Sequence, residues 1–401
     1  MGCPMHVLAA SSALRALRAI RYRGMEAWLP ELEDERPPVN LTLRANIRII
    51  SPQSPPLNLS YSHPADETLA DVNTDFLGAI ANKDIETIRL GSLGPFNKAY
   101  PLELAVFKLG RRLERKTVRA NLLRLDLPAS ALIRIDPSLW VTCPELTVML
   151  LAKRLSAIEL AQVIMELCGS YSLYPDPTAQ GEPPRYNLPP VMSLASLATF
   201  AQTARVRGNK TTLQTACQLA CEYSASPMET NVALLLSAPP ELGGYGFPKP
   251  ELNAPLIPPE GERQHLSQQG YSLDLFWQSC LADVECESTE HHLDPLTANV
   301  QDSSFAAWRT QSVLKEESDR RRFRELQYLG IQVIPVTSYD LRSEERTRSI
   351  ARALARRFQA CNARAIDEIV TRIDDPAAAL ARTSLLETLI PRRPEACTPT
   401  R

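Results

Sequence analysis

The sequence has no uninterrupted apolar segment of the roughly 20 residues that a membrane-spanning helix needs. Residues 1–25 resemble a signal peptide only briefly, because arginines interrupt their apolar part and no small-residue cleavage site follows. We therefore expect this segment to form an amphipathic helix, and we expect a cytoplasmic protein that has no membrane as a partner.

Disulfide and zinc motifs are also missing. The nine cysteines are scattered, odd in number and include no Cys-x-x-Cys pair, which argues against a disulfide framework and a zinc knuckle. The five histidines form no metal-spaced cluster beyond the adjacent pair His291 and His292. The net charge is only −2, so a surface that attracts nucleic acid would have to be local.

At 401 residues the chain is long enough for two or three domains, and proline-rich segments interrupt it. We predict an α/β (α+β) protein with a mixed, partly irregular region at 1–135 and a helical region at 136–223 that binds DNA or a partner. A domain at 224–340 follows, and residues 341–401 form a basic helix and a disordered tail.

Within the helical region, residues 144–169 carry apolar residues at helical spacing with a break near Ser156. Such a pair of helices is usually a core helical hairpin, and a DNA-binding helix-turn-helix is the alternative.

The predicted elements are clearest after Ser226. The segment "SPMETNVALLL" is a helix with Glu229 in its first turn, and "GGYGFPKPELNAPLI" is a turn followed by an irregular strand. "YSLDLFW" and "LADVECES" are two strands of a hairpin, and "KEESDRRRFRELQYLG" is a helix that Gly330 ends before the strand "IQVIPVT". The predicted order is one helix, three strands, one helix and one strand.

Three acidic residues lie in the two hairpin strands, where acids are depleted. The two-residue period of a strand separates Asp274 from its apolar neighbours, and it places Glu285 and Glu287 on one face of the second strand. If the strands pair, the three carboxylates share a face and repel each other. A divalent cation would relieve this repulsion and can activate water for attack on a phosphodiester. The alternative is a solvated face of ordinary surface acids.

The order and spacing of these segments resemble the core of the PD-(D/E)XK nuclease superfamily. More closely, the series from "SPMET" to "SDRRRFRELQYLGIQVIPVT", roughly residues 224–340, resembles an actinobacterial group of Vsr-like (very-short-patch-repair-like) endonuclease-domain proteins. The upstream "CPELTVMLLAKRLS" resembles the helical region of that group, some members of which are linked to abortive-infection toxin-antitoxin systems. The resemblance implies a restriction-endonuclease-like domain that cleaves DNA with Mg²⁺ or Mn²⁺.

Transferred by position, the resemblance implies metal ligands at Asp274 and Glu285 and a helix acid at Glu229. Glu287 departs from the superfamily pattern, because a lysine normally stands there and offsets charge in the phosphoryl-transfer transition state.

The cationic role that Glu287 cannot supply has several candidates. His291 or His292 is the first, since an imidazole can transfer protons near neutral pH, and a plain surface loop is the alternative. Lys315 and Arg322 are further candidates, although Arg322 could equally form a surface ion pair with an acid of its own helix.

Local basicity is concentrated in residues 305–373, which contain 14 Lys or Arg against 9 Asp or Glu. Four arginines of one predicted helix are candidates for phosphate contacts, namely Arg320, Arg321, Arg322 and Arg324, and a solvated helix face is the alternative. DNA is the expected partner, with RNA as a further candidate substrate. The competing function is a catalytically inactive DNA-binding or toxin-antitoxin regulatory protein on the same fold.

Overall fold

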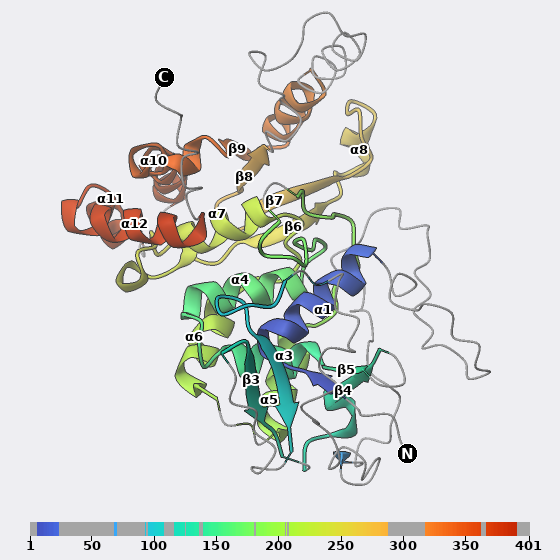
Figure 1. The fold of residues 1–401 in the computed structure, drawn as a ribbon. Coiled ribbons are helices and arrows are strands. Elements are labelled where there is room, and N and C mark those ends of the chain that lie inside the picture. Colours follow the sequence, from blue (N-terminus) through green and yellow to red (C-terminus); the bar gives the residue numbers. More distant parts are fainter. Residues whose placement is uncertain are drawn as a thin grey trace, which may run out of the picture. The chain divides into compact units, whose positions relative to one another are not determined.

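The computed structural model describes residues 6–23, 68, 69, 93, 95–107, 116–135 except 125, 139–287 except 180, 181, 205 and 207, 317–361 and 366–390. Its contacts divide the chain into two compact units, residues 1–226 and 227–401. Each unit combines helices with a mixed β-sheet, so the predicted α+β class is confirmed (Figure 1). Among the helices that the structure describes, none is both long and apolar enough to cross a membrane.

The N-terminal unit is built on a five-stranded sheet with the order β3-β2-β1-β5-β4. The central strand β1 (His6–Leu8) pairs in parallel with β5 (Leu139–Thr142) and antiparallel with β2 (Leu102–Val106). Strands β3 (Val118–Leu122) and β4 (Leu132–Arg134) form the edges. All residues of β1 and β2 are buried, as is typical of strands that are covered on both faces.

The N-terminal segment differs from the predicted amphipathic helix. Its first described residues form β1 because they pair with strands on both sides, and helix α1 covers only Ala10–Arg23. The helix is buried on almost all sides, and Arg15 and Arg21 are part of the core. Arg18 forms an ion pair at 2.6 Å with Glu166, and Arg21 donates to backbone carbonyls of Glu166 and Gly169 at 2.8 Å. The hydrogen bonds compensate for burying these charges.

The predicted helical hairpin at 144–169 is confirmed. Helix α3 (Pro144–Leu151) and helix α4 (Ala157–Leu167) are separated by a short turn. Ser156 caps α4, because its hydroxyl accepts from the backbone amide of Glu159 and the Glu159 carboxylate accepts from the backbone amide of Ser156. Two more helices are described in this unit, namely α5 (Leu194–Thr203) and α6 (Lys210–Leu219). A 3₁₀ turn, η6 (Ala129–Ala131), precedes β4.

The C-terminal unit contains a four-stranded sheet with the order β6-β7-β8-β9, and Figure 1 shows the strands side by side. The strands are β6 (Glu251–Leu256), β7 (Tyr271–Trp277), β8 (Ala282–Glu287) and β9 (Gln332–Thr337). The pairs β6–β7 and β7–β8 are antiparallel, whereas β8 and β9 are parallel. The predicted hairpin of β7 and β8 is confirmed.

The helices around this sheet follow the predicted order. Helix α7 (Pro227–Ser237) precedes the sheet, α8 (Glu260–Arg263) lies between β6 and β7, and a helix described over 317–328 precedes β9. Gly330 ends that last helix with a φ of +83°, as predicted. The amides of Gly330 and Ile331 donate to the carbonyls of Gln327 and Leu326, which is the Schellman arrangement.

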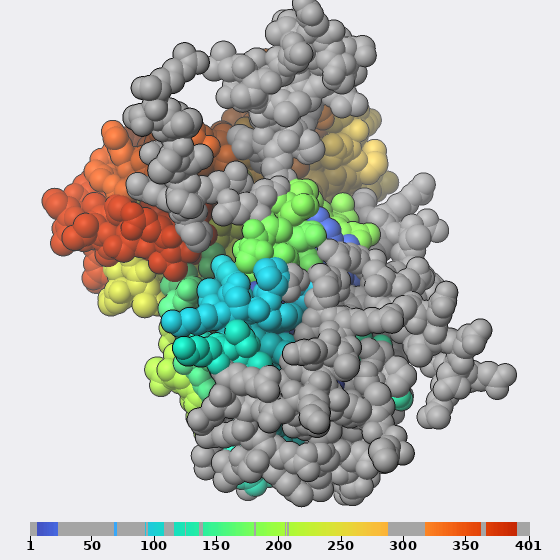
Figure 2. All heavy atoms as spheres, in the orientation of Figure 1, coloured from blue at the N-terminus to red at the C-terminus, as the bar shows by residue number. Residues whose placement is uncertain are grey.

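Residues 344–390 form three helices rather than the single basic helix that the sequence indicated. They are α10 (Glu344–Ala360), α11 (Asp367–Ile373) and α12 (Pro376–Leu389), and the predicted tail at 391–401 lies outside the described residues. Figure 2 shows their orange and red atoms as one continuous surface. Two 3₁₀ turns belong to this unit, η7 (Pro240–Leu242) and η9 (Asp340–Arg342).

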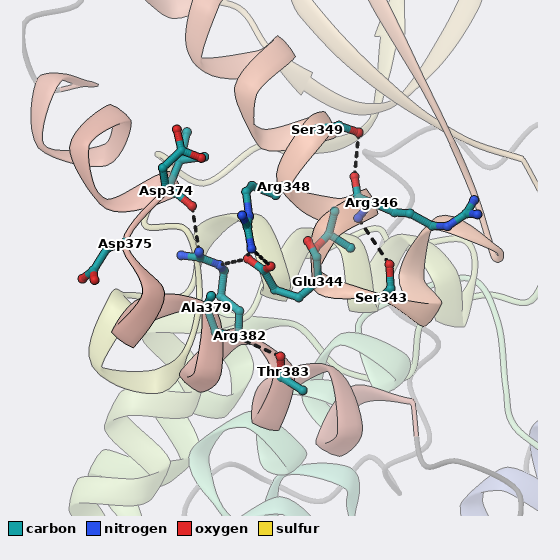
Figure 3. Close-up of polar contacts among 12 residues, drawn as sticks. Ser343, Glu344, Arg346, Arg348, Ser349, Asp374, Asp375, Ala379, Arg382 and Thr383 are labelled. Atoms are coloured by element: carbon teal, nitrogen blue, oxygen red, sulfur yellow. Dashed lines mark hydrogen bonds and ion pairs between the residues drawn. The ribbon is translucent and has the colours of Figure 1, made fainter.

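A buried arginine joins the three C-terminal helices (Figure 3). Arg382 of α12 is only 1% exposed and donates to the Glu344 carboxylate of α10 at 2.8 Å. It also donates to the carbonyl of Ile373 at 2.8 Å, at the end of α11, and its guanidinium lies 4.7 Å from the ring centre of Tyr245. Every nitrogen of this buried guanidinium therefore has a partner.

We expect Glu344→Ala to lower the free energy of unfolding by about 3 to 5 kcal/mol, because it leaves the buried Arg382 cation without its carboxylate. Urea denaturation measures the change. The matched control is Asp374→Ala, which breaks an exposed pair with Arg352 and should cost at most about 1 kcal/mol. Equal losses in the two variants would contradict a central role for Arg382.

Candidate acidic site

The pairing of β7 with β8 places the strand acids on one face of the C-terminal sheet. Phe276 lies opposite Asp283, and residues that lie opposite each other in an antiparallel pair share a face. Asp274 is two residues from Phe276, and Glu285 is two residues from Asp283, so both join that face. We call Asp274, Asp283 and Glu285 the acidic site. The other face carries the buried core residues Leu273, Leu275 and Trp277, which pack in the interior of the unit.

Asp274 is turned toward the backbone of the neighbouring strand. Its Oδ2 accepts a hydrogen bond from the backbone amide of Cys286 at 2.8 Å. Burial raises the pKa of Asp274, although the Cys286 amide and Arg322 oppose this rise. The carboxylate is thus held in place by a strand amide rather than by another side chain.

Glu285 is 6% exposed and pairs with a cation from the helix at 317–328. A terminal nitrogen of Arg322 lies 2.6 Å from Glu285 Oε1, and the same nitrogen donates to the carbonyl of Ser272. Burial and the nearby carboxylates of Asp274 and Asp283 raise the pKa of Glu285, whereas Arg322 lowers it. Arg322 is therefore part of the site, and its carboxylate partner is Glu285 of β8 rather than an acid of its own helix, which was the alternative to a phosphate contact.

Asp283 was not singled out from the sequence, yet it is the most buried member of the site. It is 0% exposed, and its carboxyl interacts with the carboxyl of Glu285 and with the backbone amide of Leu275. Burial and the charge of Asp274 raise its pKa, and its carboxyl is close enough to that of Glu285 for the two to share a proton. The sequence signal was present, because Asp283, Glu285 and Glu287 alternate along β8.

Glu229 approaches the same strands from α7. Its carboxylate is 6% exposed and accepts a hydrogen bond at 2.6 Å from the side-chain amide of Asn253 on β6. Asn253 has a φ of +50°, a left-handed conformation that asparagine tolerates better than most residues. Glu229 also raises the pKa of the Cys286 thiol, behind the larger contributions of burial and Asp274. It therefore lies near the acidic site as an additional carboxylate.

Of the remaining candidates for the site, the structure describes only Glu287. Glu287 is half-buried and, by alternation, shares the face of Glu285. The candidates His291, His292 and Lys315 lie outside the described residues, so their predicted cationic role stays a prediction.

The arginines of the helix at 317–328 point to different partners. Arg321 pairs with Glu325 at 3.1 Å, and the Arg324 side chain donates to the carbonyl of Arg320 at 3.3 Å. Arg321 and Arg324 line a cleft of about 740 Å³ together with Glu317 and Glu325. The acids in this cleft offset its basic charge, and Arg322 alone of these four contacts the acidic site in the described structure.

The chemistry of the site suits a hard cation, because one face of the sheet presents the carboxylate oxygens of three acids. In the described part of the chain, however, no three His, Cys, Asp or Glu side chains are arranged so that they could hold a metal ion together. The reason is visible in the contacts, since Asp274 is bound to a strand amide and Glu285 to Arg322.

Comparison with protein-family models, with curated proteins and with solved structures finds no match for this chain.

We expect Asp283→Asn to flatten the pH dependence of stability. The raised pKa of Asp283 means that the native state keeps a proton which the unfolded chain releases at its ordinary pKa of about 4. The contribution of Asp283 to the free energy of unfolding should therefore be greatest below about pH 4 and should fall as the pH rises toward neutral. The asparagine variant loses this contribution and should become the more stable protein at neutral pH.

The measurement is urea denaturation at a series of pH values without divalent cations. Asp367→Asn is the matched control, because Asp367 is exposed in the first turn of α11. A slope that is unchanged in Asp283→Asn, or changed equally in the control, would refute the buried, protonated carboxyl.

Proposed function

We propose that the C-terminal unit is a metal-dependent endonuclease that hydrolyses phosphodiester bonds of DNA in the cytoplasm, on a restriction-endonuclease-like core. One observation carries the proposal: the strand register gathers Asp274, Asp283 and Glu285 on one face with raised pKa values. Such crowding opposes stability unless a cation or a proton compensates it. The order of one helix, three strands, one helix and one strand supports the same proposal.

Asp274 and Glu285 would hold Mg²⁺ or Mn²⁺, and Asp283 lies on the same face beside them. Such a cation supplies a polarised water and offsets negative charge on the attacked phosphate. Asp274 keeps its position through the Cys286 amide, and Glu229 keeps its position through Asn253, so both carboxylates are held before any substrate binds.

Arg322 takes the cationic role that Glu287 cannot supply in this proposal. Its guanidinium lies at the acidic site, is planar, and can donate two parallel hydrogen bonds to phosphate oxygens. In the absence of substrate it neutralises Glu285, and a phosphate would compete for the same donors. This dual use would explain why a half-buried arginine pairs with a carboxylate that the proposal assigns to the metal.

The competing proposal is a catalytically inactive DNA-binding or toxin-antitoxin regulatory protein on the same fold. Two observations favour it, namely the acid at position 287 and the ion pair of Glu285 with Arg322. If the Arg322 guanidinium stays bound to Glu285, it occupies the position of a metal ion and prevents a metal from binding there. The two proposals differ in their dependence on divalent cations.

We expect the full-length protein to nick supercoiled plasmid with Mg²⁺ or Mn²⁺ and not with EDTA. Asp274→Asn and Glu285→Gln should each lower the rate by about 10²-fold or more, since each removes charge stabilisation at the reacting phosphate. Asp274→Asn is a sharp test, because asparagine keeps an oxygen that can accept from the Cys286 amide. Labelled single- and double-stranded DNA and RNA, assayed in parallel, identify the substrate.

The control variant is Glu251→Gln, which changes an exposed glutamate at the start of β6 and should leave the rate unchanged. DNA binding that ignores EDTA and both site variants, together with no cleavage under any condition, would favour the regulatory protein. Cleavage confined to RNA would overturn the DNA assignment.

The role of Arg322 is tested by comparing Arg322→Lys with Arg322→Met. Lysine keeps a cation but loses the fork of donors, so it should retain partial activity, whereas methionine should reduce kcat by about 10²-fold or more. Single-turnover cleavage measures both rates. Equal activity in wild type and Arg322→Met would restrict Arg322 to neutralising Glu285.

A further inference from the structure

An exposed group of one aromatic and two cationic side chains follows β9 directly. Tyr339 is 51% exposed, and the Arg346 guanidinium lies 4.0 Å from its ring centre. The Arg342 guanidinium lies 5.2 Å from the same centre, and both arginines are exposed. We call these three residues the Tyr339 cluster. Both distances are within the range of cation–π attraction, so the ring holds two guanidinium groups near each other.

No acid neutralises the two arginines in the part of the chain that the structure describes. Two acids of this turn are used elsewhere, because Asp340 accepts from the amide and hydroxyl of Thr337 and Glu344 pairs with Arg382. The third, the exposed Glu345, forms no ion pair with either arginine in the described structure. Figure 3 shows the Arg346 side chain directed away from Glu344. Two unpaired cations beside one ring repel each other, and an anion that bridges them would remove this repulsion.

The Tyr339 cluster lies just beyond the C-terminal end of β9, which is the same end of the sheet as Glu287, the last acid of β8. Strands β8 and β9 are parallel, so they end at the same edge, and Glu287 pairs there with Thr337. Tyr339 follows Thr337 by two residues. A polymer that passes over Glu285 and continues along β8 would therefore reach the cluster.

The chemistry of the cluster fits a phosphodiester backbone. A guanidinium that stacks on a ring keeps its N–H edge free for two parallel hydrogen bonds to phosphate oxygens. Arg346 is also in the first turn of α10, where the partial positive charge of the helix N-terminus adds to the attraction for anions. Small anions would need only one such cation, whereas two exposed cations on one turn suit successive phosphates of a chain.

We infer that the Tyr339 cluster binds the backbone of duplex DNA and positions it over the acidic site. The inference deepens the proposed function and depends on it for the identity of the polymer. Arg342 and Arg346 contact phosphates without reading sequence, and the Tyr339 ring fixes the direction of both guanidinium groups.

The test is binding of a labelled duplex DNA of arbitrary sequence to the full-length protein in EDTA, at increasing salt. For a duplex, each phosphate contact contributes about 0.9 to the slope of log affinity against log salt concentration. The double variant Arg342→Ala/Arg346→Ala should therefore reduce the slope by about two. Tyr339→Phe should bind like wild type, because phenylalanine keeps the ring face, whereas Tyr339→Ala should weaken binding about twofold to fivefold.

The matched control is Arg356→Ala, which removes one exposed arginine ten residues further along α10 than Arg346 and should leave the slope unchanged. A wild-type slope in the double variant, or an equal decrease in Arg356→Ala, would overturn the inference. Stronger binding of duplex RNA than of DNA, or no binding of either, would overturn it too.

The binding assay separates this inference from the proposed function. If the slope decreases as expected but Mg²⁺ produces no cleavage, the cluster binds DNA and the nuclease proposal fails. If wild type cleaves DNA and the double variant binds and cleaves normally, the nuclease proposal stands and the cluster has no part in it.

Discussion

The C-terminal unit depends on the register between β7 and β8. Leu275 lies opposite Val284, and this one pairing decides that Asp274 and Glu285 face the same way. A slip of β7 by one residue would move Asp274 to the opposite face, away from Asp283 and Glu285, and would remove Leu275 and Trp277 from the core. The register is therefore enforced by the hydrophobic effect, because Leu273, Leu275 and Trp277 are at most 3% exposed.

The same register places three buried carboxyls on one face, where their negative charges would repel each other. Burial raises the pKa of each of the three carboxyls, which lie on the same face of the sheet. Cys286 and Arg322 stabilise two of them, whereas Asp283 is fully buried beside the carboxyl of Glu285. Crowded, buried carboxyls of this kind are found at functional sites and also in structural networks, and a bound cation would relieve their repulsion.

Much of the C-terminal fold was predictable because its signals are local. The alternation in β7 and β8, the turn between them and the Schellman glycine at Gly330 each involve neighbours in the chain. Asp283 was predictable by the same alternation, and its importance was missed because burial is a property of the packed sheet. Arg322 was a candidate for a cation, but its partner is 37 residues away in sequence. Tyr339, Arg342 and Arg346 carry no motif that distinguishes them from a solvated turn.

The sequence by itself determined the element types, the α+β class and the common face of the strand acids, since periodicity, turn residues and caps act over a few residues. The tertiary structure decided which acids are buried, which cation they meet and which arginines stay without an acid. It also decided that the arginines of α1 belong to a core and that Arg382 joins three helices. These outcomes depend on contacts between residues that are far apart in the chain. Burial lowers the local dielectric constant at such contacts, so the interaction energy of each charge pair is larger than in water.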